Sequence, residues 1–224
     1  MVREGVVVIL QKAFIKLCVK LFEAKMVDFT TSKILAGFGS IMLFLAFTGA
    51  VFTRYFGAYG FLRFDPICLV FGVIGVIFVL IGMNGLSVYY RETKIYGRVL
   101  IGAFFGVISF IFLATFPVVF SVAHVFMLLM SWYFIVPFYA LADNSGKRLF
   151  RITGKMLRVC VILLLVYIIC NMLAFILLIV PFLVAILILN IFCLFLMGIT
   201  FLTLAISFFS LNVSSAARLY NYSS

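Results

Sequence analysis

Long uncharged apolar stretches alternate with short charged segments along the chain, and this alternation predicts its elements. A helix needs about 20 apolar residues to cross about 30 Å of hydrocarbon. Residues 34–52 and 67–89 meet that length without a formal charge. Two longer uncharged runs contain Pro117 and Pro181, where we expect each run to divide into two helices. The pattern therefore predicts six spans, at about 34–52, 67–89, 99–117, 120–141, 159–180 and 182–211.

The basic residues test this count of spans. Six spans place both ends of the chain and the segments 90–98 and 142–158 on one side of the membrane. That side holds 15 of the 17 Lys and Arg residues, and the other side holds Arg54 and Arg63. Basic residues collect on the cytoplasmic side, so we expect both termini to be cytoplasmic. Five or seven spans are the alternatives. They would move basic segments to the other side of the membrane and reduce the difference in basic residues between the two sides.

Composition narrows the class of protein further. The 224 residues are 67% hydrophobic and 10% charged, with a mean hydropathy of +1.39. Too few charged residues are present to cover a soluble core, so we exclude a cytosolic globular enzyme and a disordered protein. Long apolar runs also differ from the alternating strands of an outer-membrane barrel. We therefore expect an all-α, polytopic integral membrane protein of about six helices in a cell membrane, with a net charge of +11.

Residues 1–32 precede the predicted transmembrane domain, 33–213, which a short tail, 214–224, follows. Lys12, Lys16 and Lys20 recur every four residues and would form one stripe on a helix, with an apolar face opposite. This pattern predicts an interfacial amphipathic helix whose lysines contact lipid headgroups; a docking helix for a partner subunit is the alternative. The apolar stretch 5–10 is too short for a signal peptide. Met26 is an alternative start, and residues 28–32 offer side-chain oxygens that cap the first span.

The predicted spans contain no Asp, Glu, Lys or Arg, so their candidate functional residues are few. Four polar side chains stand out: Asn84, His124, Asn171 and Asn190. Within a membrane such groups typically hydrogen-bond a neighbouring helix, and a pore or ligand role is the alternative. The five cysteines show no metal-ligand spacing, and no nucleophile–base set is visible. We expect no metal, no cofactor and no catalytic residues, and hence not an enzyme.

Glycines at helical spacing indicate close helix packing. They lie in the second and third spans at Gly72, Gly75, Gly82, Gly102 and Gly106. Small residues three, four or seven apart let helix backbones approach each other where lipid supplies no hydrophobic drive. Packing among the first three spans is the favoured interpretation. A face for self-association is the alternative.

A basic segment follows the turn predicted at residues 143–146. Its cations are Lys147, Arg148, Arg151, Lys155 and Arg158, most of which share one face of a helix. Contact with the anionic inner leaflet explains this segment. Docking of an acidic cytosolic partner is the alternative, and we expect no nucleic-acid partner because no soluble domain accompanies the segment.

Several segments resemble one known family. They are KILAGFGSIML at 33–43, GVIFVLIG at 75–82, LSVYYR at 86–91, RLFRITG at 148–154 and AISFFS at 205–210. Together they are similar to the uncharacterised archaeal and bacterial membrane family catalogued as domain of unknown function 996, over roughly residues 32–211. The resemblance implies an archaeal or bacterial cytoplasmic membrane. It brings no known activity, cofactor or binding residues.

The sequence thus favours a non-catalytic membrane protein, a structural or accessory subunit that packs with itself or with other membrane subunits. The alternative is a small channel or transporter for a neutral or weakly polar solute, lined by Asn, Thr and Ser side chains. A membrane-embedded enzyme comes third, because no catalytic set is visible.

Overall fold

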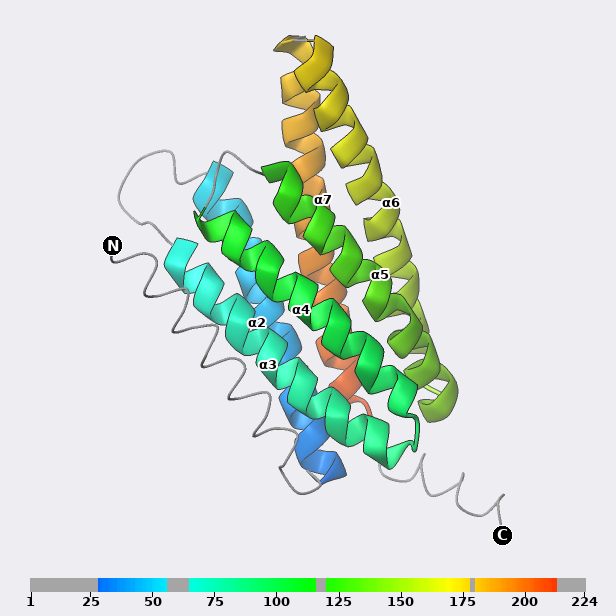
Figure 1. Cartoon of the computed structure of the whole chain (residues 1–224). Coiled ribbons are helices and arrows are strands. Elements are labelled where there is room, and N and C mark those ends of the chain that lie inside the picture. The colour runs from blue at the N-terminus through cyan, green and yellow to red at the C-terminus, as the bar shows by residue number, and fades with distance from the viewer. Residues whose placement is uncertain (1–27, 56–64, 116–119, 178–179, 213–224) are drawn as a thin grey trace.

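The computed structural model describes residues 28–55, 65–115, 120–177 and 180–212. This part of the chain forms six α-helices and contains no strand (Figure 1). All six are long and apolar enough to cross a membrane, so the protein is an all-helical, multi-pass membrane protein, as expected. The helices are α2 (Phe29–Tyr55), α3 (Asp65–Tyr89), α4 (Thr93–Thr115), α5 (Phe120–Ser145), α6 (Arg148–Leu177) and α7 (Val180–Phe209).

The helix boundaries differ from the predicted spans most clearly at α6. This helix begins at Arg148, eleven residues before the start of the predicted span at 159, because the basic segment has helical side-chain spacing and continues directly into the span. Pro181 lies in the first turn of α7, where a missing backbone N–H costs no hydrogen bond. Pro117 lies outside the described residues, as do residues 1–27 with the predicted amphipathic helix and residues 213–224.

The six helices form a closed ring in which each packs against its neighbours in sequence, and α7 returns to pack against α2. The ends of this closing pair are tied together by Lys33, whose Nζ donates a hydrogen bond of 2.8 Å to the carbonyl oxygen of Leu211. A cation beside the carboxyl end of a helix also interacts favourably with the helix dipole. The first and last described helices are therefore direct neighbours.

Aromatic rings from four helices meet inside this ring. Phe47 of α2 stacks on Phe201 of α7, with ring centroids 5.6 Å apart and planes 8° from parallel. Phe201 also meets Phe134 of α5 edge-on at 6.5 Å. Phe110 of α4 lies 5.0 Å from Phe47. All four side chains are buried, so the middle of the bundle is filled by offset and edge-on ring contacts.

Glycines allow α2 and α3 to touch through their backbones. A Cβ atom added at Gly39 would lie 2.6 Å from the carbonyl oxygen of Gly75, and one added at Gly82 would lie 2.5 Å from that of Ser32. The other glycines singled out in the sequence accept a large side chain of a neighbouring helix: Gly72 faces Phe110, Gly102 faces Phe134 and Gly106 faces Met130. These glycines therefore lie at helix contacts within the chain.

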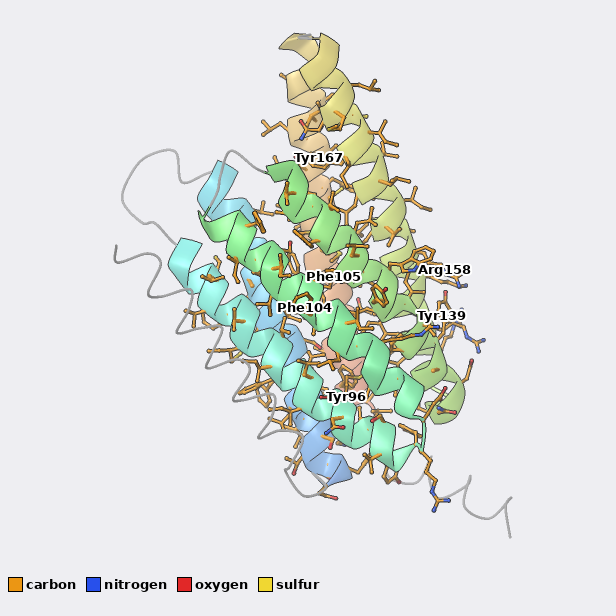
Figure 2. All side chains as sticks on the ribbon, viewed as in Figure 1. Tyr96, Phe104, Phe105, Tyr139, Arg158 and Tyr167 are labelled. Carbon is orange, nitrogen blue, oxygen red and sulfur yellow. The ribbon has the colours of Figure 1, made fainter. Side chains whose placement is uncertain are left out.

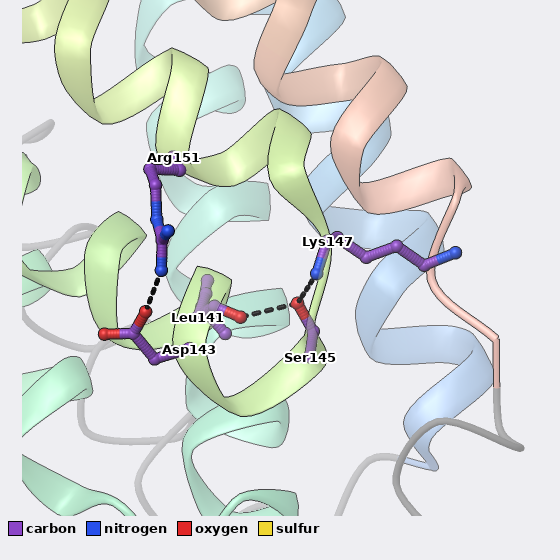
Figure 3. Close-up of polar contacts among 5 residues, drawn as sticks. All are labelled: Leu141, Asp143, Ser145, Lys147 and Arg151. Carbon is purple, nitrogen blue, oxygen red and sulfur yellow. Dashed lines mark hydrogen bonds and ion pairs between the residues drawn. The ribbon is translucent and has the colours of Figure 1, made fainter.

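The α5–α6 turn consists of Gly146 and Lys147 and is drawn in Figure 3, so it overlaps the turn predicted at 143–146 only at Gly146. Residues 143–145 instead form the end of α5. Gly146 adopts a positive φ of 66°, which glycine reaches without steric cost. The Ser145 hydroxyl donates to the carbonyl of Leu141 and accepts the backbone N–H of Lys147 at 3.3 Å (Figure 3). These bonds join the end of one helix to the start of the next without a long loop.

The α3–α4 turn uses a left-handed residue that is not glycine. Arg91 has a φ of 53°. The N–H of Glu92 donates to the carbonyl of Ser87 at 2.9 Å, and that of Arg91 donates to the carbonyl of Val88 at 3.1 Å. This pair of bonds is the Schellman motif that ends many helices. It reverses the chain within three residues.

Candidate functional site between α5, α6 and α7

A cluster of polar side chains is buried where α5, α6 and α7 meet. His124 of α5 and Asn190 of α7 are joined by a hydrogen bond of 2.9 Å between His124 Nε2 and Asn190 Oδ1. Tyr167 of α6 completes the cluster, with its ring centroid 4.4 Å from that of His124. All three side chains are buried, so the cluster is a group of polar side chains surrounded by apolar helix faces.

The hydrogen bond defines the chemistry available at His124. Asn190 Oδ1 is an acceptor, so the tautomer that makes this bond carries its proton on Nε2. A hydrogen bond between a neutral imidazole and an amide involves no formal charge, which suits a site in hydrocarbon where a buried ion is costly. The cluster can therefore hold helices together, or exchange its internal bond for one to a small polar group.

Further polar and sulfur contacts continue from this cluster along the same three helices. The Ser131 hydroxyl of α5 donates to its own helix and lies 3.6 Å from the sulfur of Met197 on α7. Cys160 of α6 lies 3.7 Å from the hydroxyl oxygen of Thr200 on α7. Asn190, Met197 and Thr200 recur at helical spacing, so they put one mildly polar face of α7 against α5 and α6.

The structure brings together two of the four polar residues singled out in the sequence, His124 and Asn190. His124 and Asn190 make the contact between spans that was expected of them. Asn84 is half-buried on α3, and its backbone carbonyl accepts the Ser87 hydroxyl. Asn171 is half-buried on α6, one turn beyond Tyr167. Tyr167 was not predicted, although a tyrosine inside an apolar span is the pattern that could have marked it.

The basic residues of 147–158 lie in the α5–α6 turn and the first three turns of α6. Arg151 pairs with Asp143 at 2.7 Å, and both side chains are exposed (Figure 3). The Arg158 guanidinium lies 4.6 Å from the centre of the Tyr139 ring of α5, and the two are labelled together in Figure 2. Arg148 and Lys155 are exposed, and Lys147 is half-buried. These residues therefore line the outside of the bundle.

Most described charges gather at the same end of the bundle as these basic residues. Only Arg54 and Asp65 lie at the opposite end. At the charged end, Asn144 of α5 donates a hydrogen bond of 2.7 Å to the Glu92 carboxylate of the α3–α4 turn. Among the described residues, no three His, Cys, Asp or Glu side chains come together as a metal site.

Comparisons with known proteins add no relative: no protein-family model matches the chain, and no similar chain was found among curated proteins or solved structures.

Proposed function

We propose that this chain is a non-catalytic protein of the cell membrane, a structural or accessory subunit that packs in an oligomer or a larger membrane complex. The observation that supports this role is a stripe of large apolar side chains along the outer face of α7. The exposed members of this α7 stripe recur at helical spacing and include Val184, Ile188, Phe192, Phe195, Leu202, Ile206 and Phe209.

The lack of charge on the α7 stripe favours a second copy of the chain as the neighbour that covers it. α7 contains no charged residue, and Phe38 of α2 extends the stripe by an edge-on contact with Phe209. Two copies related by a two-fold axis bring the same face together, so like charges on that face would repel. The exposed face of α6 carries Arg151, Lys155 and Arg158 and is less suited to this pairing. Close packing of large side chains then supplies the attraction between helices.

Photo-crosslinking tests this proposal. A photoreactive phenylalanine analogue at Phe195 samples the α7 stripe, and the same analogue at Ile162 on α6 is the matched control, because both side chains are exposed. In native membranes we expect an adduct of twice the chain mass at Phe195 and little at Ile162. An adduct with a different membrane protein at Phe195 would place the chain in a larger complex. A lone monomer in mild detergent, with no adduct at Phe195, contradicts the proposal.

The orientation of the bundle is part of the same proposal. We place the charged end of the bundle, where α2, α4 and α6 begin, on the cytoplasmic side. The supporting observation is that nine of the ten described Lys and Arg residues lie at that end. The chain then lies in the membrane of an archaeal or bacterial cell, as its resemblance to the uncharacterised family implies.

The second candidate is a small channel or transporter for a neutral or weakly polar solute. The buried cluster of His124, Asn190 and Tyr167 favours it, because a solute could replace the internal hydrogen bond. Flux of such a solute into liposomes containing the protein, lost on Asn190→Leu, would support this function. Flux equal to that of empty liposomes across a panel of solutes would remove it.

A further inference from the structure

One exposed face of α6 changes from basic to apolar about one third of the way along the helix. Arg151, Lys155 and Arg158 are followed on the same face by Ile162 and Ile169, and all five are exposed. Their spacing of three, four or seven residues keeps them in one row along the helix. We call this row the α6 stripe. It presents cations and then aliphatic side chains to the same neighbour.

Two of the three cations on the α6 stripe have no acidic partner among the residues that the structure describes. Asp143 neutralises Arg151 at 2.7 Å. In the described part of the chain, no acidic side chain pairs with Lys155 or Arg158. Arg158 is nevertheless held in place, because its guanidinium lies 4.6 Å from the centre of the Tyr139 ring (Figure 2). The face therefore offers two neighbouring positive charges, one of them positioned in advance, for an anion from outside the bundle.

The position of these cations defines the chemistry of that anion. Arg158 lies ten residues into α6, about 15 Å along its axis, and Ile162 follows one turn later. A ligand that satisfies the whole face carries a negative group beside Lys155 and Arg158 and an apolar chain beside Ile162 and Ile169. An acidic soluble protein reaches only the basic turns. A phospholipid with an anionic headgroup matches both parts.

We propose that the α6 stripe is a binding site for one anionic phospholipid, with its phosphate between Lys155 and Arg158 and an acyl chain along Ile162 and Ile169. Tyr139 is a positioning residue that fixes the Arg158 guanidinium. The inference rests on the chain crossing a membrane and not on its role as a subunit. Its failure would leave the α7 stripe and its crosslinking test untouched.

The only tryptophan of the chain provides the measurement. Trp132 is 61% exposed and lies two turns from Tyr139 on the same face of α5. The whole chain is reconstituted in phosphatidylcholine vesicles that contain a minor fraction of brominated phosphatidylglycerol or, in parallel, of brominated phosphatidylcholine. Bromine quenches tryptophan emission on contact, so quenching reports the lipid beside Trp132. We expect brominated phosphatidylglycerol to associate about fivefold more strongly than brominated phosphatidylcholine.

Variants and added anions separate this site from general charge attraction. Lys155→Gln with Arg158→Gln should abolish the excess quenching, and Lys155→Arg with Arg158→Lys should retain it. Arg54 lies near the end of α2, at the end of the bundle away from Lys155 and Arg158. Arg54→Gln is therefore the matched control and should leave the excess quenching unchanged. Unchanged emission in pure phosphatidylcholine verifies that the variants fold. Equal quenching by the two brominated lipids, or excess quenching that survives the double Gln variant, overturns the proposal. Displacement by inorganic phosphate overturns the lipid assignment in favour of a soluble anion.

Discussion

Tyr90, just after α3, carries a buried hydroxyl that finds no partner among the described residues. Within the described part of the chain its hydroxyl is out of contact with water and makes no hydrogen bond. Burial raises the pKa of Tyr90 to about 12, and the neighbouring Tyr89 adds to the shift by charge repulsion. An unsatisfied hydroxyl costs free energy in the folded state, so this position limits stability.

Replacing this tyrosine tests that cost. Tyr90→Phe should raise the free energy of unfolding by about 1 kcal/mol at neutral pH. The folded state holds the phenol proton more tightly than the unfolded chain, whose pKa is 10.0. The stability that this proton contributes is complete below pH 10 and is lost as the pH rises towards 12. The variant should lose less stability over that range. Thermal unfolding in detergent at several pH values measures both effects, with Tyr89→Phe as the control.

The His124–Asn190 bond gives a second prediction at this scale. His124→Leu and Asn190→Leu should each destabilise the bundle, and the double variant should show a coupling energy of about 1 kcal/mol. Chemical unfolding in detergent micelles provides the three free energies. Thr153→Val is the control partner for Asn190→Leu, because Thr153 bonds within its own helix. Additive effects for the histidine pair would contradict a direct bond between the helices.

Sequence reasoning identified these polar residues individually but not their partners. A polar group inside a span predicts a contact with another helix, and that holds for His124 and Asn190. The two lie 66 residues apart, and only the ring arrangement of α5, α6 and α7 brings them together. Asn84 has the same sequence context but lies on α3, away from this cluster.

At the scale of helices, glycine positions decide which pairs pack most closely. α2 and α3 touch through backbone atoms at Gly39, Gly75 and Gly82, where an added Cβ atom would overlap the other helix. Backbone cannot move aside as a side chain does, so a larger residue at these positions forces α2 and α3 apart. Gly97 of α4 differs, since no described atom beyond its chain neighbours and the adjacent helix backbone lies within 4 Å of its added Cβ.

A matched pair of alanine substitutions tests this difference. Gly82→Ala should destabilise the protein by about 2 kcal/mol, because α2 and α3 must separate. Gly97→Ala should stabilise it by up to about 1 kcal/mol, because alanine favours the helix and meets no described side chain there. Thermal unfolding in detergent compares the two with the unaltered chain. Equal effects would show that helix propensity, and not the contact between helices, controls Gly82.

The helices themselves were largely predictable, because the hydrocarbon thickness imposes a minimum apolar length on each. The lengths of the uncharged runs predicted the six helices, and α2 and α3 lie close to their expected bounds. α6 begins eleven residues before the span predicted at 159, because the membrane limits where apolar residues lie and not where helical hydrogen bonds begin. The contact between α2 and α7 could not be predicted, because the hydrophobic pattern of a helix does not identify its neighbour.

For the whole molecule, the testable property is its orientation. Arg148→Cys places a thiol at the start of α6, at the charged end of the bundle. In intact cells a membrane-impermeant thiol reagent should leave this cysteine unlabelled, and permeabilisation should expose it. Phe61→Cys lies between the first two predicted spans, in residues 53–66, which are expected on the outer side; it is the control that should be labelled from outside. The native cysteines require comparison with the unaltered chain. Labelling of Arg148→Cys in intact cells would invert the topology.

The closure of the ring between α2 and α7 imposes an order on biosynthesis. About 125 residues separate the end of α2 from the start of α7. At roughly 5–20 residues per second, α2 waits about 6–25 s after its own synthesis before its partner leaves the ribosome. During that interval the side of α2 that receives Phe209 at Gly37 has no native neighbour. Chains that stop before α7 share this unfilled surface, which membrane chaperones and proteases can use to distinguish unfinished chains from complete ones.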